Sequence, residues 1–176
     1  MGRSGLILLL LTLGILHPAS LVPLQPMCDQ SVMDKYIQDA STIESEIEQL
    51  CRTSCCFPEP VTVLDTRVNF PAWKAMDRSR QASEVWRGQA LLSAAVLQVK
   101  RQQPAVFLHH LEAIESHLRS IREILRGHHA QAAAQDEPSS PTLSVRTVKK
   151  LVNVYSSFLR GKVNLFVSGA CRGDGR

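Results

Sequence analysis

Four stretches of the chain repeat apolar residues every three or four positions, the spacing that aligns them on one face of an α-helix. They run from Asp29 to Leu50, from about Trp73 to Lys100, from Phe107 to Gly127 and from Val148 to Phe166. The third is the most regular, because its apolar residues alternate strictly between steps of four and three. The pattern therefore predicts four amphipathic helices.

Individual residues predict how these helices begin and end. Ser31, followed three positions later by Asp34, predicts a cap at the start of the first helix. Pro104 suits the first turn of the third helix, and Gly127 suits its end. Gly161 predicts a kink, with the fourth helix continuing beyond it.

The lengths of the connections predict the directions in which the helices run. The connection at 51–71 has roughly twenty residues, that at 101–103 only a few, and that at 128–143 roughly sixteen. Antiparallel neighbours need only a short loop, whereas parallel helices need a chain that travels back along the bundle. The order long, short, long predicts an all-α, up-up-down-down four-helix bundle with two long crossover connections.

The two crossovers differ in their predicted structure. In the first, Val61, Val63 and the segment 66–68 alternate with polar residues, which predicts a short strand. In the second, the alanines at 132–134 and the prolines and serines at 136–141 predict a flexible connection.

The beginning of the chain predicts export from the cell. Arg3 precedes an apolar run from Leu6 to Leu16, and small residues follow that run. Because a bilayer span needs about twenty apolar residues, the run predicts a secretory signal peptide at residues 1–22 and not a membrane anchor. Residues 23–176 are then expected to form one extracellular domain with no membrane insertion.

Charge and histidine content predict no catalytic or nucleic-acid function. The net charge is +4, and basic clusters such as Lys149 with Lys150 are typical of solvated helix faces. Aromatic residues do not alternate with the basic ones, so no nucleic-acid partner is expected. His110 and His117 lie two turns apart on the third helix, which favours exposed titrating side chains over a metal site. No nucleophile, phosphate-binding or dinucleotide motif occurs, so neither an enzyme nor a cofactor is predicted.

All five cysteines lie beyond the predicted signal peptide, where oxidising surroundings favour disulfides. Four of them can pair and one is left over. A zinc site is not predicted, because Cys51, Cys55 and Cys56 have no matching His or Cys pair downstream at finger spacing.

Several short features have more than one interpretation. Arg172–Gly173–Asp174 matches the tripeptide that integrins bind, although a match this short also occurs by chance. Trp86 has the spacing of a core residue, whereas Trp73 fits a core or a binding role. No Asn precedes x-Ser or x-Thr, so N-linked sugars are not expected, and the polar segment 139–142 is either a plain loop or a site of O-linked sugar.

Two segments, Val63 to Met76 and Tyr155 to Lys162, resemble segments of the erythropoietin/thrombopoietin family. Shorter matches at Trp86–Gly88 and Leu118–Ser120 and the spacing of four cysteines extend the resemblance over most of the chain. It implies a long-chain helical cytokine, monomeric when free, that brings together two copies of a single-pass cytokine receptor. Such a hormone activates receptor-associated tyrosine kinases and supports the survival, proliferation and differentiation of erythroid precursors.

The resemblance implies a strong receptor-binding face on the first crossover and the fourth helix. Its residues are Thr66, Arg67, Val68, Asn69, Phe70, Ser157, Arg160, Gly161 and Leu165. Ser157 and Asn153 depart from the family, which usually has Asn and Arg there, so the contact is expected to persist in a re-tuned form.

The resemblance also implies a weak receptor-binding face on the first and third helices. Its residues are Val32, Lys35, Tyr36, Ser116, Arg119, Ser120, Ile124 and Arg126. Ser116, Arg119 and Ser120 lie at i, i+3 and i+4 and therefore form one patch, in which Arg119 is expected to matter most.

The same resemblance implies disulfides between Cys28 and Cys171 and between Cys51 and Cys55, with Cys56 as the odd thiol. An alternative function remains, in which a secreted bundle carries a lipid or another small apolar molecule between its helices. A bundle closed by a disulfide from end to end argues against this alternative.

Overall fold

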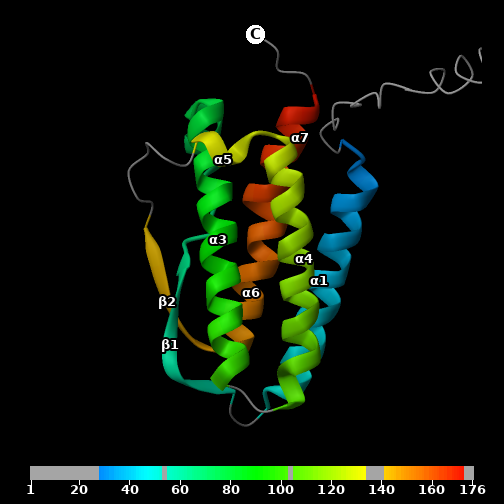
Figure 1. Cartoon of the computed structure of the whole chain (residues 1–176), viewed down its shortest axis with the longest axis vertical. Helices are drawn as coiled ribbons and strands as arrows, with labels where there is room; N and C mark the ends of the chain where they lie inside the picture. Colours follow the sequence, from blue (N-terminus) through cyan, green and yellow to red (C-terminus); the bar gives the residue numbers. More distant parts are fainter. Residues whose placement is uncertain (1–27, 53–54, 103–104, 134–140, 173–176) are drawn as a thin grey trace, which may run out of the picture.

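The computed structural model describes residues 28–52, 55–102, 105–133 and 141–172. Its long helices are α1 (Gln30–Leu50), α3 (Arg78–Gln102), α4 (Leu108–Gly127) and α6 (Val148–Phe158), the last extended by α7 (Asn164–Cys171). In Figure 1, α1 and α3 run in one direction, and α4 and α6 run in the other. The predicted up-up-down-down bundle is confirmed. Within the described part of the chain, no helix is both long and apolar enough to cross a membrane.

The first helix is capped by a residue other than the predicted one. The Asp29 carboxylate accepts a hydrogen bond of 2.9 Å from the Ser31 amide, so Asp29 is the N-cap and the predicted Ser31–Asp34 cap is wrong. The reason is geometric, because a short carboxylate at the N-cap reaches the first free amides of the helix directly.

The predicted second helix is two helices with a break between them. A short helix, α2 (Phe70–Ala75), ends at Met76, whose extended backbone (ψ 138°) separates it from α3. Asn69 caps α2 by accepting from the Ala72 amide, and Asp77 accepts from the Arg80 amide at 2.8 Å. Two capping side chains within one periodic stretch therefore divide it, and the prediction of one helix from Trp73 is wrong at its start.

The crossovers pair with each other as a two-stranded antiparallel sheet. The first contains β1 (Cys56–Leu64), which confirms the predicted strand but ends before the segment 66–68. The second contains β2 (Thr142–Thr147), which the sequence did not predict, with Val61 opposite Val145 and Val63 opposite Leu143. In Figure 1 the two strands lie side by side along one flank of the bundle, and β1 packs on α3.

The third and fourth predicted helices need only small corrections. A 3₁₀ turn, η1 (Ala105–Phe107), precedes α4, which ends at Gly127 as predicted and is followed by the short α5 (Ala130–Ala133). The fourth helix continues through Gly161, as predicted, by way of a π-helical turn, η2 (Leu159–Val163). Four predicted features lie outside the described residues: the signal peptide at 1–22, Pro104, most of the flexible segment (134–140), and Gly173–Asp174 of the integrin-like tripeptide.

The core of the bundle is filled with large side chains. The fourth helical segment consists of α6, η2 and α7, and its residues Tyr155, Phe158 and Phe166 are fully buried. Trp73 and Trp86 are buried as well. The core position predicted for Trp86 is therefore confirmed, and Trp73 is a core residue too. Gly88 of α3 lies so close to Phe158 that a Cβ atom at residue 88 would stand 2.6 Å from the ring.

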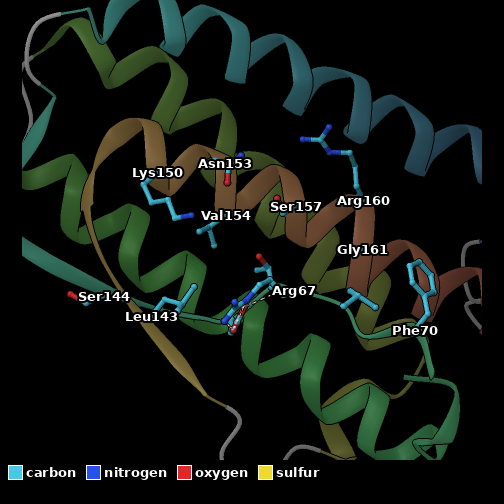
Figure 2. Close-up of a pocket in the computed structure, with 13 residues that line it drawn as sticks. Arg67, Phe70, Leu143, Ser144, Lys150, Asn153, Val154, Ser157, Arg160 and Gly161 are labelled. Atoms are coloured by element: carbon cyan, nitrogen blue, oxygen red, sulfur yellow. Dashed lines mark hydrogen bonds and ion pairs between the residues drawn. The ribbon is translucent and has the colours of Figure 1, made fainter. Parts of the chain in front are cut away.

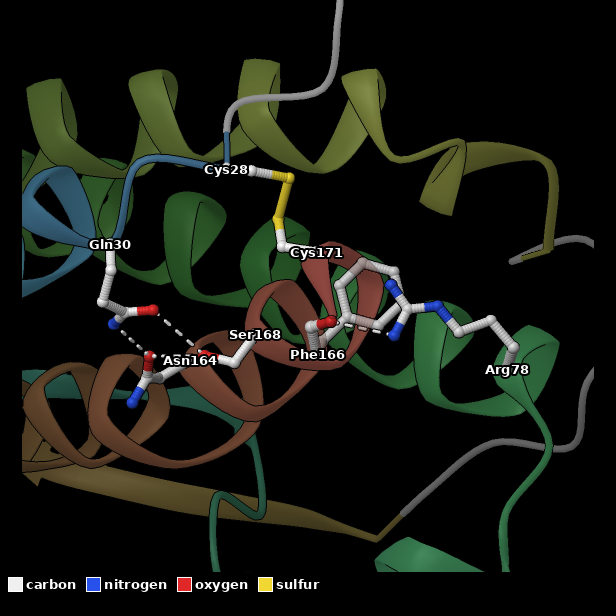
Figure 3. Close-up of a disulfide and its surroundings, with 7 residues drawn as sticks. All are labelled: Cys28, Gln30, Arg78, Asn164, Phe166, Ser168 and Cys171. Carbon is white, nitrogen blue, oxygen red and sulfur yellow. Dashed lines mark hydrogen bonds between the residues drawn. A yellow bond between two sulfur atoms is a disulfide. The ribbon is translucent and has the colours of Figure 1, made fainter. Parts of the chain in front are cut away.

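Disulfides and polar contacts close one end of the bundle. Cys28 is bonded to Cys171, with Cα atoms 5.4 Å apart, which joins the start of α1 to the end of α7 (Figure 3). Beside it, Arg78 stacks on the Phe166 ring at 3.7 Å and donates to the Phe166 carbonyl at 2.8 Å. The second disulfide joins Cys51 to Cys55, and Cys56 is exposed and outside both. These are the two pairs that the resemblance implies.

Candidate functional site

A surface hollow of about 650 Å³ lies between the first crossover and the fourth helical segment (Figure 2). Seven residues of the strong face line it: Thr66, Arg67, Val68, Phe70, Ser157, Arg160 and Gly161. Asn69 and Leu165 of that face are not in the lining. The lining also includes residues that the sequence reasoning did not assign to the face: Asp65, Leu143, Ser144, Lys150, Asn153 and Val154. Leu143 and Ser144 belong to β2, so they could not be placed there without the strand.

Three basic side chains surround this hollow, and two of them are held by acids. Arg67 forms an ion pair of 2.7 Å with Asp65. The hydrogen bonds that the Arg67 side chain donates to this carboxylate hold the pKa of Asp65 below its usual range. Arg160 donates to Glu44 of α1 at 2.8 Å. Lys150 is exposed at the α6 end of the hollow (Figure 2). A partner that docks here therefore meets three cations, two of which are already paired with acids of this chain, so acidic groups in the partner complement Lys150 most directly.

Close contact between the first crossover and η2 shapes the floor of the hollow. A Cβ atom at Gly161 would stand 3.0 Å from Val68, so glycine permits this approach. The π turn places Gly161 against the crossover, whereas the Arg160 side chain points toward α1, where it reaches Glu44 (Figure 2); π turns of this kind are frequent at functional sites. Thr66 is buried and Asn69 is used as the cap of α2, whereas Phe70 is 56 % exposed. Phe70 is consequently the large apolar contact that this face offers.

An ion pair that is nearly closed to solvent lies next to the hollow, and the pattern of residues along the chain did not predict it. The Lys162 ammonium lies 2.7 Å from Glu84 of α3 and donates to the Asp65 carbonyl at 2.8 Å. Lys162 therefore connects the fourth helical segment to α3 and to the first crossover at once.

Of the eight residues that the resemblance assigns to the weak face, four on α1 and α4 are exposed. Lys35, Ser116, Arg119 and Arg126 are exposed, and Tyr36 and Ser120 are half-buried. Val32 is half-buried against the core, and Ile124 is only 7 % exposed, so it offers a partner little surface.

Arg119, the residue expected to matter most on this face, projects into solvent. Its side chain is 71 % exposed and pairs with Glu115 at 3.1 Å. Lys100 of α3 also binds Glu115, at 2.6 Å, and this hydrogen bond is the main cause of the lowered pKa of Glu115. Glu115 therefore keeps a partner even when Arg119 is engaged elsewhere.

Two histidines of α4 are less exposed than predicted. The side chain of His110 is 12 % exposed and lies 2.8 Å from Glu46, and that of His117 is 18 % exposed and contacts two tyrosines. Helical periodicity does not predict these contacts, because the partner residues belong to other helices. Elsewhere, His128 lies close to the sulfur atoms of Cys28 and Cys171, but a disulfide offers no thiolate to a metal.

The fold and the connections define the class of the molecule. Four long helices joined up-up-down-down by two crossovers are the architecture of the helical cytokines.

Comparison with known proteins identifies the family within this class. A sequence model described as erythropoietin/thrombopoietin matches residues 25–174. Erythropoietin of the horse, Equus caballus, is 41 % identical over 177 residues, covering 94 % of this chain and 91 % of its own length. The pig protein (Sus scrofa) is 42 % identical over 179 residues and the mouse protein (Mus musculus) 38 % over 177, each with the same two coverages. The chain belongs to the erythropoietin/thrombopoietin family of cytokine hormones.

Proposed function

We propose that this chain is a secreted hormone that binds two copies of a single-pass cytokine receptor, one on each face described above. Pairing of the receptors activates their associated tyrosine kinases and supports erythroid precursors. The observation that carries the proposal is the convergence of seven strong-face residues on one hollow, in a chain that matches the family over residues 25–174.

The strong face has the features of a high-affinity contact. It combines a hollow, an exposed aromatic ring at Phe70 and the guanidinium groups of Arg67 and Arg160, and aromatic and arginine side chains are enriched among binding hot spots. The Glu44 carboxylate orients Arg160 before a receptor binds, which lowers the entropy lost on binding.

The weak face presents charged side chains, of which Arg119 is the one expected to matter most. Arg119 offers a guanidinium group that can bind two acceptors in one plane, and its own partner Glu115 is also held by Lys100. Release of Arg119 to a receptor therefore leaves no unpaired carboxylate behind.

The proposal includes export by cleavage of residues 1–22 and a monomeric hormone. The disulfides Cys28–Cys171 and Cys51–Cys55 fit an oxidising destination. The carrier alternative has less support, because the described interior is occupied by buried side chains such as Tyr155, Phe158 and Leu118.

The test uses the soluble ectodomain of an erythropoietin-type receptor and cells that carry the whole receptor. We expect Arg160→Ala to weaken one-to-one binding by at least about tenfold, typical of a hot-spot residue. Arg101→Ala is the matched control, since Arg101 is exposed at the end of α3 and does not line the hollow. If the wild-type hormone activates no kinase in such cells, the proposed function is wrong.

A further inference from the structure

A cluster of ionisable side chains lies under the weak face, where α1, α4 and α6 meet. His117 of α4 is at its centre. Its ring is 5.2 Å from the ring of Tyr36, in an edge-on contact, and its Nδ1 atom is 2.8 Å from the Tyr155 hydroxyl. Tyr36 belongs to α1 and Tyr155 to α6, so one imidazole connects three helices.

Within the described part of the chain, the ionisable groups that face His117 come from two helices. From α1 these are Lys35, Tyr36 and Asp39, and from α6 the buried Tyr155. The Asp39 carboxylate is 3.7 Å from Nε2 of His117, but the ammonium group of Lys35 holds that carboxylate at 2.8 Å. The carboxylate that could stabilise a charged imidazole is therefore shared with a lysine.

The geometry points to His117 as a positioning residue of the weak face, which holds Tyr36 in its receptor-binding position while the imidazole is neutral and releases it when the imidazole is protonated. This inference rests on the proposed function, because Tyr36 and Lys35 belong to the face assigned there to the second receptor. It adds that pairing of the receptors is sensitive to acid, as it would be after internalisation into an acidic compartment.

The physical reason is the low solvation of the ring. Only 18 % of the His117 side chain is exposed, and a receptor seated over Tyr36 would cover part of what remains. Desolvation disfavours the charged form of a histidine. Burial accordingly lowers the pKa of His117, the charge of Asp39 opposes that effect, and Lys35 adds to it.

The consequence for binding has a definite sign. A receptor that binds the neutral, clamped form more tightly must lower the pKa of His117 further. By linkage, acidification through the range in which His117 titrates then weakens the contact with the second receptor. The strong face lies on the first crossover and the fourth helical segment, and no member of this cluster lines its hollow.

The closing experiment measures the two receptor contacts separately at two pH values. Hormone is captured on immobilised receptor ectodomain through the strong face, and binding of a second soluble ectodomain is then recorded at pH 7.4 and pH 5.5. Titration of groups on the receptor contributes equally to every hormone variant, so the comparison between variants isolates the hormone. The variants are His117→Gln, which cannot titrate but retains a hydrogen-bonding group, and His117→Phe, which cannot titrate but retains a ring beside Tyr36. His109→Gln is the matched control, because His109 is exposed on the same helix.

We expect the wild type and His109→Gln to lose about three- to tenfold more second-receptor affinity on acidification than either His117 variant, because one pKa unit of coupling corresponds to tenfold. Equal acid sensitivity in the wild type and in the folded His117 variants overturns the inference. An imidazole of His117 that titrates at or above the ordinary histidine pKa of about 6.5 in a magnetic resonance titration also overturns it. Failure of the wild type to bind even the first receptor at pH 7.4 is a different outcome, which contradicts the proposed function itself.

Discussion

The ammonium group of Lys162 lies 2.7 Å from the Glu84 carboxylate, and the two side chains are only 9 % and 11 % exposed. The same ammonium group donates to the backbone carbonyl of Asp65, whose side chain pairs with Arg67 of the strong face. A buried charge needs a partner, because an unpaired one leaves its desolvation uncompensated. The pair therefore links the stability of the bundle to the position of the receptor-binding crossover.

Replacement of Lys162 by alanine should be strongly destabilising. It leaves Glu84, whose side chain is only 11 % exposed, without its cation, and removal of one partner of a buried pair typically costs about 3 to 5 kcal/mol. Urea unfolding at neutral pH measures the change. The control is Lys149→Ala, which breaks the exposed pair with Glu48 and should cost less than about 1 kcal/mol. Similar losses in the two variants would show that the Lys162 pair is not buried in solution.

Gly88→Ala should destabilise the bundle although alanine is the better helix former. The added methyl group would stand 2.6 Å from the Phe158 ring, and overpacking of this kind typically costs about 1 to 3 kcal/mol. Gly169→Ala is the matched control on α7, where the nearest atom is a guanidinium nitrogen of Arg78 at 3.4 Å, an ordinary van der Waals distance. There the gain in helix propensity, about 1 kcal/mol, should make the variant neutral or more stable. Thermal unfolding of the two variants measures both effects. A stabilised Gly88→Ala variant would contradict the close packing of Gly88 on Phe158.

Arg119→Ala should separate the two receptor faces. Because Arg119 is 71 % exposed, its loss should change the free energy of unfolding by less than about 0.5 kcal/mol and leave one-to-one binding intact. Kinase activation in receptor-bearing cells should fail, since pairing needs the weak face. Normal signalling by this variant, or loss of one-to-one binding, would refute the assignment of the weak face to α1 and α4.

The Lys100–Glu115 contact between α3 and α4 should make stability depend on pH in the acidic range. The folded-state pKa of Glu115 lies below its ordinary value of 4.5, chiefly because Lys100 donates to the carboxylate. A lowered pKa means that this contribution is present above about pH 4.5 and is lost as the pH falls through the folded-state value. Urea unfolding at pH 7 and pH 3 should therefore show a larger advantage of the wild type over Glu115→Gln at the higher pH. A difference of equal size at both pH values would contradict this origin.

The Cys28–Cys171 disulfide closes the longest loop in the chain. With a sequence separation of 143 between the partners, the chain-entropy relation gives a contribution of about 4 to 5 kcal/mol. Replacement of both cysteines by serine should lower the free energy of unfolding by that order.

Peptide mapping without reduction checks the pairing of all the cysteines. A Cys51–Cys56 bond, or a dimer linked through Cys56, would contradict the second disulfide, Cys51–Cys55.

The sequence by itself determined the four long helices, their order and their directions. Apolar spacing identified the face that each helix buries, as Leu111, Leu118 and Leu125 of α4 show by being fully buried. Loop length determined direction, because only a long connection joins parallel neighbours. Both signals are local in the chain, which is why they needed no knowledge of the packed structure.

Only the tertiary structure decided what depends on contacts between distant segments. The strand β2 exists because β1 supplies its hydrogen-bonding partner, and Leu143 and Ser144 reach the hollow for that reason. The burial of Lys162 with Glu84 and the contacts of His117 with Tyr36 and Tyr155 likewise join residues from different helices. Periodicity places such residues on a face of their own helix, but only packing of the helices decides what lies opposite.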